Sequence, residues 1–164
     1  MSSARGELAA LAVDRLAGRT VLPDVLVAAA VRAVVEGLDS PTLPELAALS
    51  RDDTTASELF ALVVAELDLE VPADAAAARW QLLGEALAVL ARGEVPVGKG
   101  AAAVGELDDR LGHPDALREM RSWIAMFDSW IPTDVTPVSF PEDQIRQQAR
   151  ELLAGPWPPH HPDS

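Results

Sequence analysis

The sequence contains no cysteine, and Lys99 is its only lysine. Without cysteine the chain has neither a disulfide framework nor a thiolate metal site. Long apolar runs are missing as well. The most apolar stretch, residues 25–35, is interrupted by Arg32 and is much shorter than the ~20 residues that span a bilayer. Residues 1–18 lack the continuous apolar centre of a signal peptide. We therefore expect a cytoplasmic protein.

Basic residues are scarce, with 13 against 26 acidic residues and a net charge of −13. The excess is spread evenly: residues 1–72 carry 12 acids and 5 bases (−7), and residues 73–164 carry 14 acids and 8 bases (−6). Nucleic acids and anionic membranes bind clustered Lys and Arg, so neither partner is expected. A basic protein would be attracted to such a surface. The alternative is that the charge serves only solubility.

The length and composition fit one globular domain, since the chain has 164 residues, of which 49% are hydrophobic and 24% charged. After Gly155 the sequence reads Pro-Trp-Pro-Pro-His-His-Pro, which is typical of an extended, polyproline-like segment. We predict a single helical domain over residues 1–155 and a flexible tail, rich in proline and histidine, over residues 156–164.

Apolar residues recur at helical spacing along nearly the whole chain, and no segment shows the two-residue alternation of a strand. The predicted fold is all-α, a compact bundle of about eight short helices. Three predicted starts carry the capping-box pattern, at Thr42/Glu45, Thr55/Glu58 and Ser139/Glu142. The predicted helices cover residues 4–17, 23–36, a short segment from Thr42, 55–67, 73–92, 96–111, 115–131 and a last segment around 145–153.

Two predicted helices have a distinctive apolar pattern. Residues 23–36 are apolar on most of the helix circumference, so we expect a central, buried helix. In residues 115–131 the apolar positions follow a 3-4-3-4 spacing, which predicts a continuous seam against neighbouring helices. The seam consists of Leu117, Met120, Ile124, Phe127 and Ile131.

Helix-terminating glycines recur in both halves with the same spacing. Gly18 and Gly37 lie 19 positions apart, Gly93 and Gly112 also lie 19 apart, and the second pair follows the first at an offset of 75. Each pair brackets a helix that opens at a proline. The pattern predicts a duplication, with two stacked three-helix units. Chance spacing of helix ends is the alternative.

Residues 93–100, GEVPVGKG, nearly match the phosphate-binding P-loop. That loop requires a Ser or Thr after its lysine to hold magnesium and a strand before it. Here Gly100 occupies the hydroxyl position, and the preceding residues have a helical pattern. We interpret this segment as a Gly/Pro turn between two helices, and we expect no nucleotide or other cofactor.

Acidic pairs and histidines are the remaining candidates for chemistry. Asp52-Asp53 and Asp108-Asp109 lie in a loop and near a helix end, where we expect them to be solvated. His113-Pro114-Asp115 is the tripeptide of J-domain co-chaperones, but the preceding helix is acidic here, so we expect it only to start the next helix. No nucleophile has a credible histidine base, and a zinc site needs three ligands. The sequence therefore assigns no catalytic residue and no metal ligand.

Three aromatic residues share one helical strip, Trp123, Phe127 and Trp130. Such stripes are usually core. The alternative is a partly exposed aromatic rim suited to a partner that carries Arg or Lys, with Asp128 and Asp134 supplying opposite charge. The candidate partner-binding residues are Trp123, Asp128, Trp130 and Asp134.

Six segments carry a resemblance to a known group of proteins. These are residues 36–49 (EGLDSPTLPELAAL), 58–60 (ELF), 66–69 (ELDL), 91–96 (ARGEVP), 123–130 (WIAMFDSW) and 153–159 (LAGPWPP). The chain resembles small, acidic, Ala-rich uncharacterised actinobacterial helical proteins. Its second half is similar to short helical proteins of the immunity or antitoxin-like kind. This resemblance implies binding rather than catalysis.

We therefore expect a non-catalytic protein that binds another macromolecule, for example by neutralising a basic protein such as a toxin. Two alternatives remain open: a helical module that holds a small ligand near Trp80 or Trp123, and an enzyme whose carboxylates are assembled only by the fold. A deep, enclosed pocket with converging acids would favour these alternatives, whereas a convex or grooved acidic surface would favour protein binding.

Overall fold

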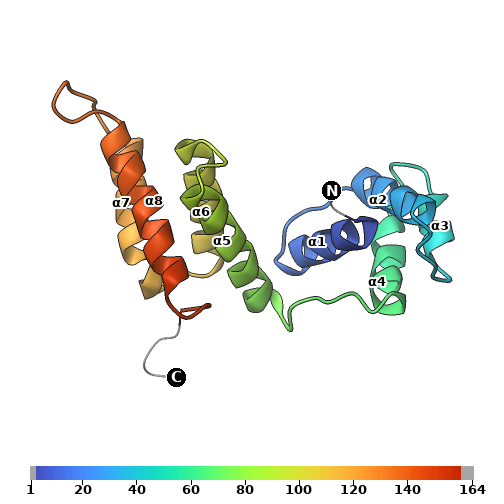
Figure 1. Cartoon of the computed structure of the whole chain (residues 1–164). Coiled ribbons are helices and arrows are strands. Elements are labelled where there is room, and N and C mark those ends of the chain that lie inside the picture. Colours follow the sequence, from blue (N-terminus) through green and yellow to red (C-terminus); the bar gives the residue numbers. More distant parts are fainter. Residues whose placement is uncertain (1–2, 160–164) are drawn as a thin grey trace. The chain divides into compact units, whose positions relative to one another are not determined.

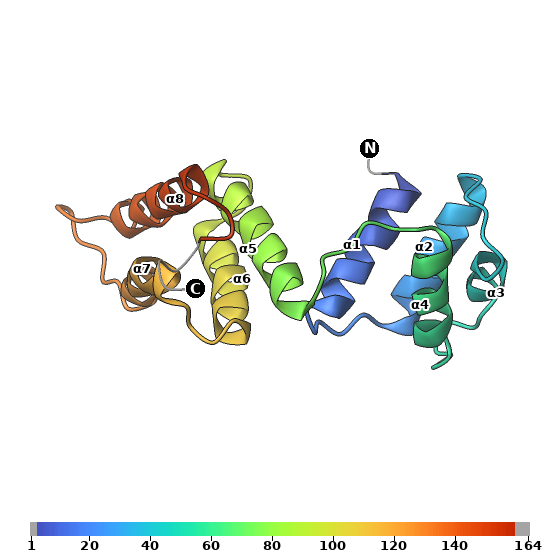
Figure 2. The same cartoon turned by 90° about the horizontal axis from the view of Figure 1, so that it is seen from below.

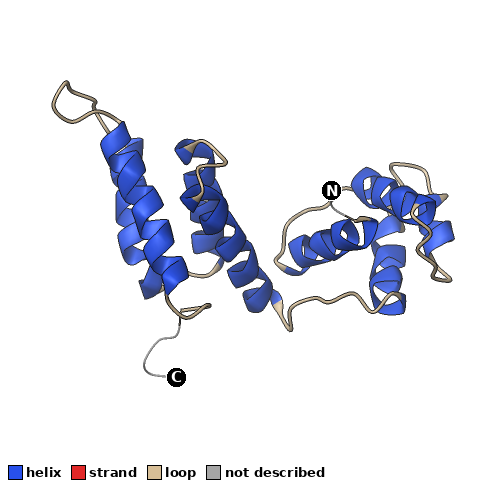
Figure 3. Cartoon of the chain, in the orientation of Figure 1, coloured by secondary structure: helices blue, strands red, loops and turns tan. Residues whose placement is uncertain are grey.

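The computed structural model describes residues 3–159, and in this part every regular element is helical (Figure 3). The all-α prediction is confirmed. None of the described helices is long and apolar enough to cross a bilayer. The elements are α1 (Ala4–Leu16), α2 (Pro23–Val35), α3 (Leu43–Ala47), α4 (Ala56–Glu66), α5 (Ala75–Ala91), α6 (Val97–Arg110), a 3-10 turn η1 (Asp115–Leu117), α7 (Arg118–Asp128) and α8 (Ser139–Ala154).

The described chain divides into two compact units between Ala78 and Arg79, within α5. Unit 1 contains α1 to α4, and unit 2 contains most of α5 together with α6, η1, α7 and α8 (Figure 1). Each unit has a buried apolar cluster of its own. The two-unit organisation agrees with the sequence pattern, although each unit has four α-helices rather than three. The single helical domain over residues 1–155 stays a prediction.

In unit 1, α2 packs against α1, α3 and α4 (Figure 2). One side of α2 is buried, and its buried side chains are Leu26, Val27, Ala29, Ala30 and Ala33. The opposite side is also apolar but lies in solvent, with Val31 44% and Val35 81% exposed. The expectation of a buried helix is therefore wrong for half of its circumference, because the three neighbours cover only one side.

The hydroxyl residues at the three predicted capping boxes do not cap their helices. Thr42 donates its hydroxyl proton to Glu66 of α4, whose other carboxylate oxygen accepts the Thr42 backbone N–H at 2.9 Å. These hydrogen bonds hold the pKa of Glu66 below its ordinary value. At α1 a side-chain N-cap does occur, since Ser3 Oγ accepts the Gly6 N–H at 3.1 Å. At α3, a contact between helices has replaced the local cap.

In unit 2, α8 packs against both α6 and α7. The fully buried side chains come from every helix of the unit and from η1: Leu83, Leu87, Leu90, Leu107, Leu117, Met120 and Ile145. The core of this unit therefore combines the start of the predicted seam with residues of α5, α6 and α8.

The seam helix is shorter than predicted, because α7 ends at Asp128 instead of residue 131. Pro132 disfavours helical backbone at Ile131, and its ring would collide with the carbonyl four residues earlier. Leu117 and Met120 of the seam are fully buried, Ile124 and Phe127 are half-buried, and Ile131 is 82% exposed. The buried seam is confirmed in its first half and wrong at its end.

The four glycines of the predicted repeat end their helices in the same way. Gly18, Gly37, Gly93 and Gly112 have φ between 69° and 91°, a region that favours glycine. The residue after each glycine bonds back across the last turn, as in Arg19 N–H to Asp14 O and Glu94 N–H to Val89 O, both 3.0–3.1 Å. The offset of 75 also holds for the last residues of the helices: α1 ends at Leu16 and α5 at Ala91, and α2 ends at Val35 and α6 at Arg110.

The first residues of the predicted tail are described, and Trp157 among them lies against α5. Its indole N–H donates to the Trp80 carbonyl at 3.1 Å, and the two indole rings meet edge to face at 5.7 Å. Gly84 makes room for this contact, since a Cβ there would lie 2.9 Å from Trp157 Nε1. His160 and His161 lie outside the described residues.

We expect Gly84→Ala to displace Trp157 from α5 and to raise the acrylamide quenching of tryptophan fluorescence above that of wild type. Thermal stability should change little, because the added helix propensity of about 1 kcal/mol offsets the lost contact. Gly105→Ala is the matched control, since a Cβ there meets nothing within 4 Å. Quenching that is the same in both alanine variants would contradict this role of Gly84.

Candidate functional site

The loop between α7 and α8 projects beyond the ends of both helices (Figures 1 and 2). We call this loop and the adjoining helix ends the α7–α8 tip. Its large apolar side chains are Trp123, Met126, Trp130, Ile131, Val135, Val138 and Phe140. The tip contains all four residues that the sequence proposes for partner binding, Trp123, Asp128, Trp130 and Asp134.

Local chemistry gives the tip its shape. Pro132 ends α7, and a pair of threonines then closes the loop: Thr133 donates its backbone N–H to the Thr136 carbonyl at 3.1 Å, and its hydroxyl oxygen accepts the Thr136 N–H at 3.0 Å. The two hydroxyls also lie 2.7 Å apart. Trp130 is fixed to the same turn, because its indole N–H donates to the Thr136 carbonyl at 3.2 Å.

Phe140 brings the two candidate tryptophans into one aromatic group. Its ring centroid lies 6.1 Å from that of Trp123, in an edge-to-face arrangement, and 5.9 Å from that of Trp130. Both tryptophans are half-buried. Phe127 packs against the core of unit 2, whereas Trp130 packs on Phe140. The aromatic group therefore extends from the core of unit 2, against which Trp123 packs, through Phe140 to Trp130.

The most exposed apolar residues of the tip escaped the sequence analysis. Ile131 is 82% and Val135 89% exposed, and Phe140 is 44% exposed. Ile131 belongs to the predicted buried seam, Val135 lies in the predicted connection, and Phe140 directly follows the predicted helix start at Ser139. The available signal was Pro132 itself, which forbids the helical backbone that a buried Ile131 would need.

The charge of the tip is entirely negative. Asp128 and Asp134 are exposed, and Glu142 and Asp143 lie on the first turn of α8. Between Arg121 and Arg146 the sequence contains no lysine or arginine. The tip thus combines exposed apolar side chains with four carboxylates, one of which, Asp143, pairs with Arg146 at 3.9 Å.

The acid pair at the end of α6 behaves differently at its two positions. Asp109 is exposed as expected, but Asp108 is buried, with 5% of the residue exposed. Arg121 of α7 donates Nε and one Nη to the two Asp108 oxygens at 2.7 and 2.8 Å. The expectation of a solvated Asp108 is wrong, because it is the anchor of an ion pair that ties α6 to α7.

This ion pair determines what the adjacent group can do. Asp108, Asp109 and His113 bring three potential metal ligands within 4.8 Å of one another. Both oxygens of Asp108 already accept from Arg121, and His113 Nδ1 lies 3.1 Å from one of them. A cation would have to displace a guanidinium and then sit beside it. The arrangement therefore suits a structural clamp, and His113-Pro114-Asp115 starts η1 as expected.

The segment that resembles a P-loop lies between two helices, as predicted. Helix α5 precedes it, and α6 begins at Val97, so Lys99 belongs to the first turn of α6. Gly100 serves helix packing: a Cβ there would lie 2.5 Å from the Leu90 Cγ of α5. A hydroxyl side chain could not be placed at this position without separating the two helices.

The hollow nearest the middle of α7 is small. It has a volume of about 40 Å³ and is lined by Val104, Gly105, Asp108, Leu117, Met120, Arg121 and Ile124. Ligand pockets in proteins usually measure about 300–1,000 Å³. This hollow has space for little more than one water molecule.

Comparison with known proteins adds no relative to this picture. No protein-family model matches the chain, and no curated protein or solved structure matches it either.

Proposed function

We propose that this chain is a non-catalytic, cytoplasmic binding protein whose α7–α8 tip holds a basic partner protein, in the manner of an immunity factor that neutralises a cationic toxin. One observation carries the proposal: Ile131 and Val135 lie almost fully in solvent beside four carboxylates, of which Asp143 pairs with Arg146 at 3.9 Å. Soluble proteins seldom expose clustered apolar side chains unless a partner covers them.

The tip has the components of a protein interface. Half-buried aromatics are frequent at the centres of interfaces, where they bury large areas at low entropic cost. Trp123, Trp130 and Phe140 supply such a centre, and the Thr133–Thr136 turn holds its edge in place. The surrounding carboxylates would steer a basic partner and accept its arginines.

The two alternative functions have less support. A small ligand near Trp123 would need more space than the hollow of about 40 Å³ beside α7 offers. An enzyme would need converging, reactive carboxylates. Among the described residues, Asp108, Asp109 and His113 come close together, but Arg121 neutralises Asp108, the buried acid of this group. The tip is also convex, which suits a protein partner better than an enclosed substrate.

The test is a pull-down from native lysate, followed by titration of each captured protein in purified form. We expect wild type to retain a basic protein, and the double variant Ile131→Ser, Val135→Ser to lose at least tenfold in affinity for it. Both side chains are exposed, so the variant should melt at the same temperature as wild type. Replacing Asp128 and Asp134 by Asn should slow association and weaken its salt dependence.

Leu62→Ser is the matched control, because Leu62 is 52% exposed on α4 and lies outside the tip. Binding that survives all tip substitutions, or that Leu62→Ser weakens equally, would refute the proposal. If wild type binds neutral or anionic lipid vesicles and the Ser double variant does not, the partner of the tip is a membrane and the proposed protein partner is wrong.

A further inference from the structure

The exposed side of α2 is the second large apolar surface of the described chain. It faces away from α1, α3 and α4 and carries Val25, Ala28, Val31 and Val35, with Leu22 and Val34 at its borders. A hollow of about 400 Å³ lies along it, lined by Asp24, Val27, Ala28, Val31, Arg32 and Arg51. We call this surface the α2 face.

The α2 face is self-complementary about Ala28. Positions equally distant from residue 28 carry matching side chains: Val25 matches Val31, and Leu22, the N-cap of the helix, matches Val34. Asp24 and Arg32, also equidistant from residue 28, carry opposite charges. When two identical helices pack antiparallel with a two-fold axis at residue 28, each residue lies opposite its counterpart in this set. The arrangement therefore pairs apolar with apolar and acid with base.

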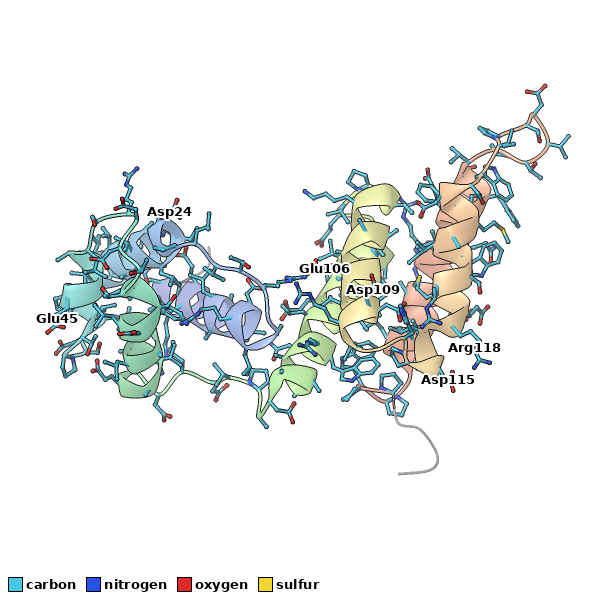
Figure 4. The ribbon with its side chains drawn as sticks, turned by 180° about the vertical axis from the view of Figure 1, so that it is seen from behind. Asp24, Glu45, Glu106, Asp109, Asp115 and Arg118 are labelled. Carbon is cyan, nitrogen blue, oxygen red and sulfur yellow. The ribbon has the colours of Figure 1, made fainter. Side chains whose placement is uncertain are left out.

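From this pattern we propose that the chain forms a symmetric dimer in which the α2 faces of two copies pack antiparallel, centred on Ala28. The small central residue lets the helix axes approach to about 8 Å. Asp24 of each copy lies opposite Arg32 of the other, which gives two intermolecular ion pairs. Figure 4 labels Asp24 on unit 1, where its carboxylate is exposed.

Charges around the face support a second copy as the occupant. Arg32 lines the hollow and donates Nε and Nη2 to the two carboxylate oxygens of Glu7 in α1, which fixes the guanidinium at the border of the face and leaves Nη1 to meet the Asp24 of the other copy. Arg51 lines the same hollow and adds a second positive charge next to the position of the partner copy's acid. Elsewhere two chains of net charge −13 repel each other, so a surface balanced in charge is a favourable place for them to meet.

The dimer makes a concentration-dependent prediction. One helix face is smaller than a standard interface, so we expect a weak dimer. Sedimentation velocity in 0.15 M salt should show the mass rising from 17.4 kDa toward twice that value between about 5 and 500 µM. Val31→Glu should remain a monomer throughout, and the control Leu62→Glu should dimerise like wild type.

The register is tested by mixing two charge variants. Asp24→Arg places two arginines opposite each other, and Arg32→Asp places two aspartates opposite each other, so each variant alone should be monomeric. An equimolar mixture should dimerise, because every pair in the mixed dimer again combines opposite charges. Circular dichroism checks that each variant is folded; should Arg32→Asp unfold, Asp24→Arg and Val31→Glu still test the face.

A wild type that stays monomeric over the whole range, or a dimer that Val31→Glu leaves intact, would overturn the proposal. If Val31→Glu abolishes the dimer but the mixture of Asp24→Arg and Arg32→Asp does not dimerise, the antiparallel register is overturned. Because none of these residues belongs to the α7–α8 tip, the result is independent of the proposed function.

Discussion

Replacing Arg121 by alanine is expected to lower the free energy of unfolding at pH 7 by about 2–3 kcal/mol. Asp108 would keep its charge in a buried position while losing both hydrogen bonds from the guanidinium. Breaking a fully buried ion pair costs about 3–5 kcal/mol. The expected loss is smaller here because the Arg121 side chain is 36% exposed, so water can reach the site in the variant. Urea unfolding followed by circular dichroism measures the difference.

The loss of unfolding free energy in Arg121→Ala should also depend on pH. Burial raises the pKa of Asp108, but the hydrogen bonds from Arg121 and His113 outweigh it and hold that pKa below the ordinary value of 3.8. A depressed folded-state pKa contributes stability that is present above about pH 3.8 and is lost as the pH falls through the folded-state value. In Arg121→Ala the hydrogen bonds from Arg121 are gone while burial still raises the pKa of Asp108, so the variant should have the higher pKa. The stability difference between wild type and variant should therefore narrow as the pH falls through the folded-state pKa of the variant and then through the lower one of wild type.

Arg118→Ala is the matched control on the same helix. Arg118 pairs with Asp115 at 2.6 Å, but both side chains are more than half exposed (Figure 4). Exposed pairs contribute about 0–1 kcal/mol, so this variant should stay close to wild type at every pH. An Arg121→Ala variant as stable as Arg118→Ala at pH 7 would show that the buried pair does not stabilise unit 2.

Gly100→Ala should destabilise the protein by about 1–2 kcal/mol, although alanine is the better helix former. The new methyl would lie 2.5 Å from Leu90 Cγ and 2.6 Å from Leu90 Cδ2. Leu90 is fully buried, so a methyl at this position forces its side chain, or α5 and α6 themselves, to shift. Overpacking of this kind costs about 1–3 kcal/mol, and the gain in helix propensity of about 1 kcal/mol offsets only part of it.

Gly105→Ala separates the steric effect from the gain in helix propensity, because it places the same methyl in the same helix with nothing within 4 Å. It should stabilise the protein by up to about 1 kcal/mol. Thermal melts of both variants therefore should move in opposite directions. Equal shifts would mean that Gly100 is not a contact point between the helices. Gly100→Ser, which completes the P-loop sequence, should destabilise as Gly100→Ala does and should gain no affinity for ATP with magnesium.

Helix identity and helix ends could be predicted from the sequence because both depend on local chemistry. The four glycines at 18, 37, 93 and 112 end their helices where expected, since positive φ is accessible to glycine at little cost. The capping box at Thr42 was wrong for the opposite reason. The Thr42 hydroxyl has a better acceptor in Glu66, 24 positions away, and no local pattern reveals such a partner.

Burial was harder to predict than secondary structure. The sequence shows which residues are apolar, but not which side of an apolar helix will find a neighbour. Val31 and Ile131 both looked like core residues and are both exposed. Asp108 looked like a surface residue and is buried, because Arg121, 13 positions later, neutralises it. The candidate residues Trp123 and Trp130 both lie in the tip, but Phe140, which joins them, is not among the candidates from the sequence.

Each core is built from one continuous stretch of the chain, so the two cores are completed one after the other during synthesis. All residues of the unit 1 cluster lie between Ala4 and Leu69, so this core is complete before most of α5 has left the ribosome. Synthesis of the remaining chain takes on the order of 5–20 s at roughly 5–20 residues per second. Helical domains fold in microseconds to milliseconds, so unit 1 can fold while it is still tethered. The α2 face is then present seconds before the α7–α8 tip, and nascent chains on neighbouring ribosomes could pair through it before either can bind a partner.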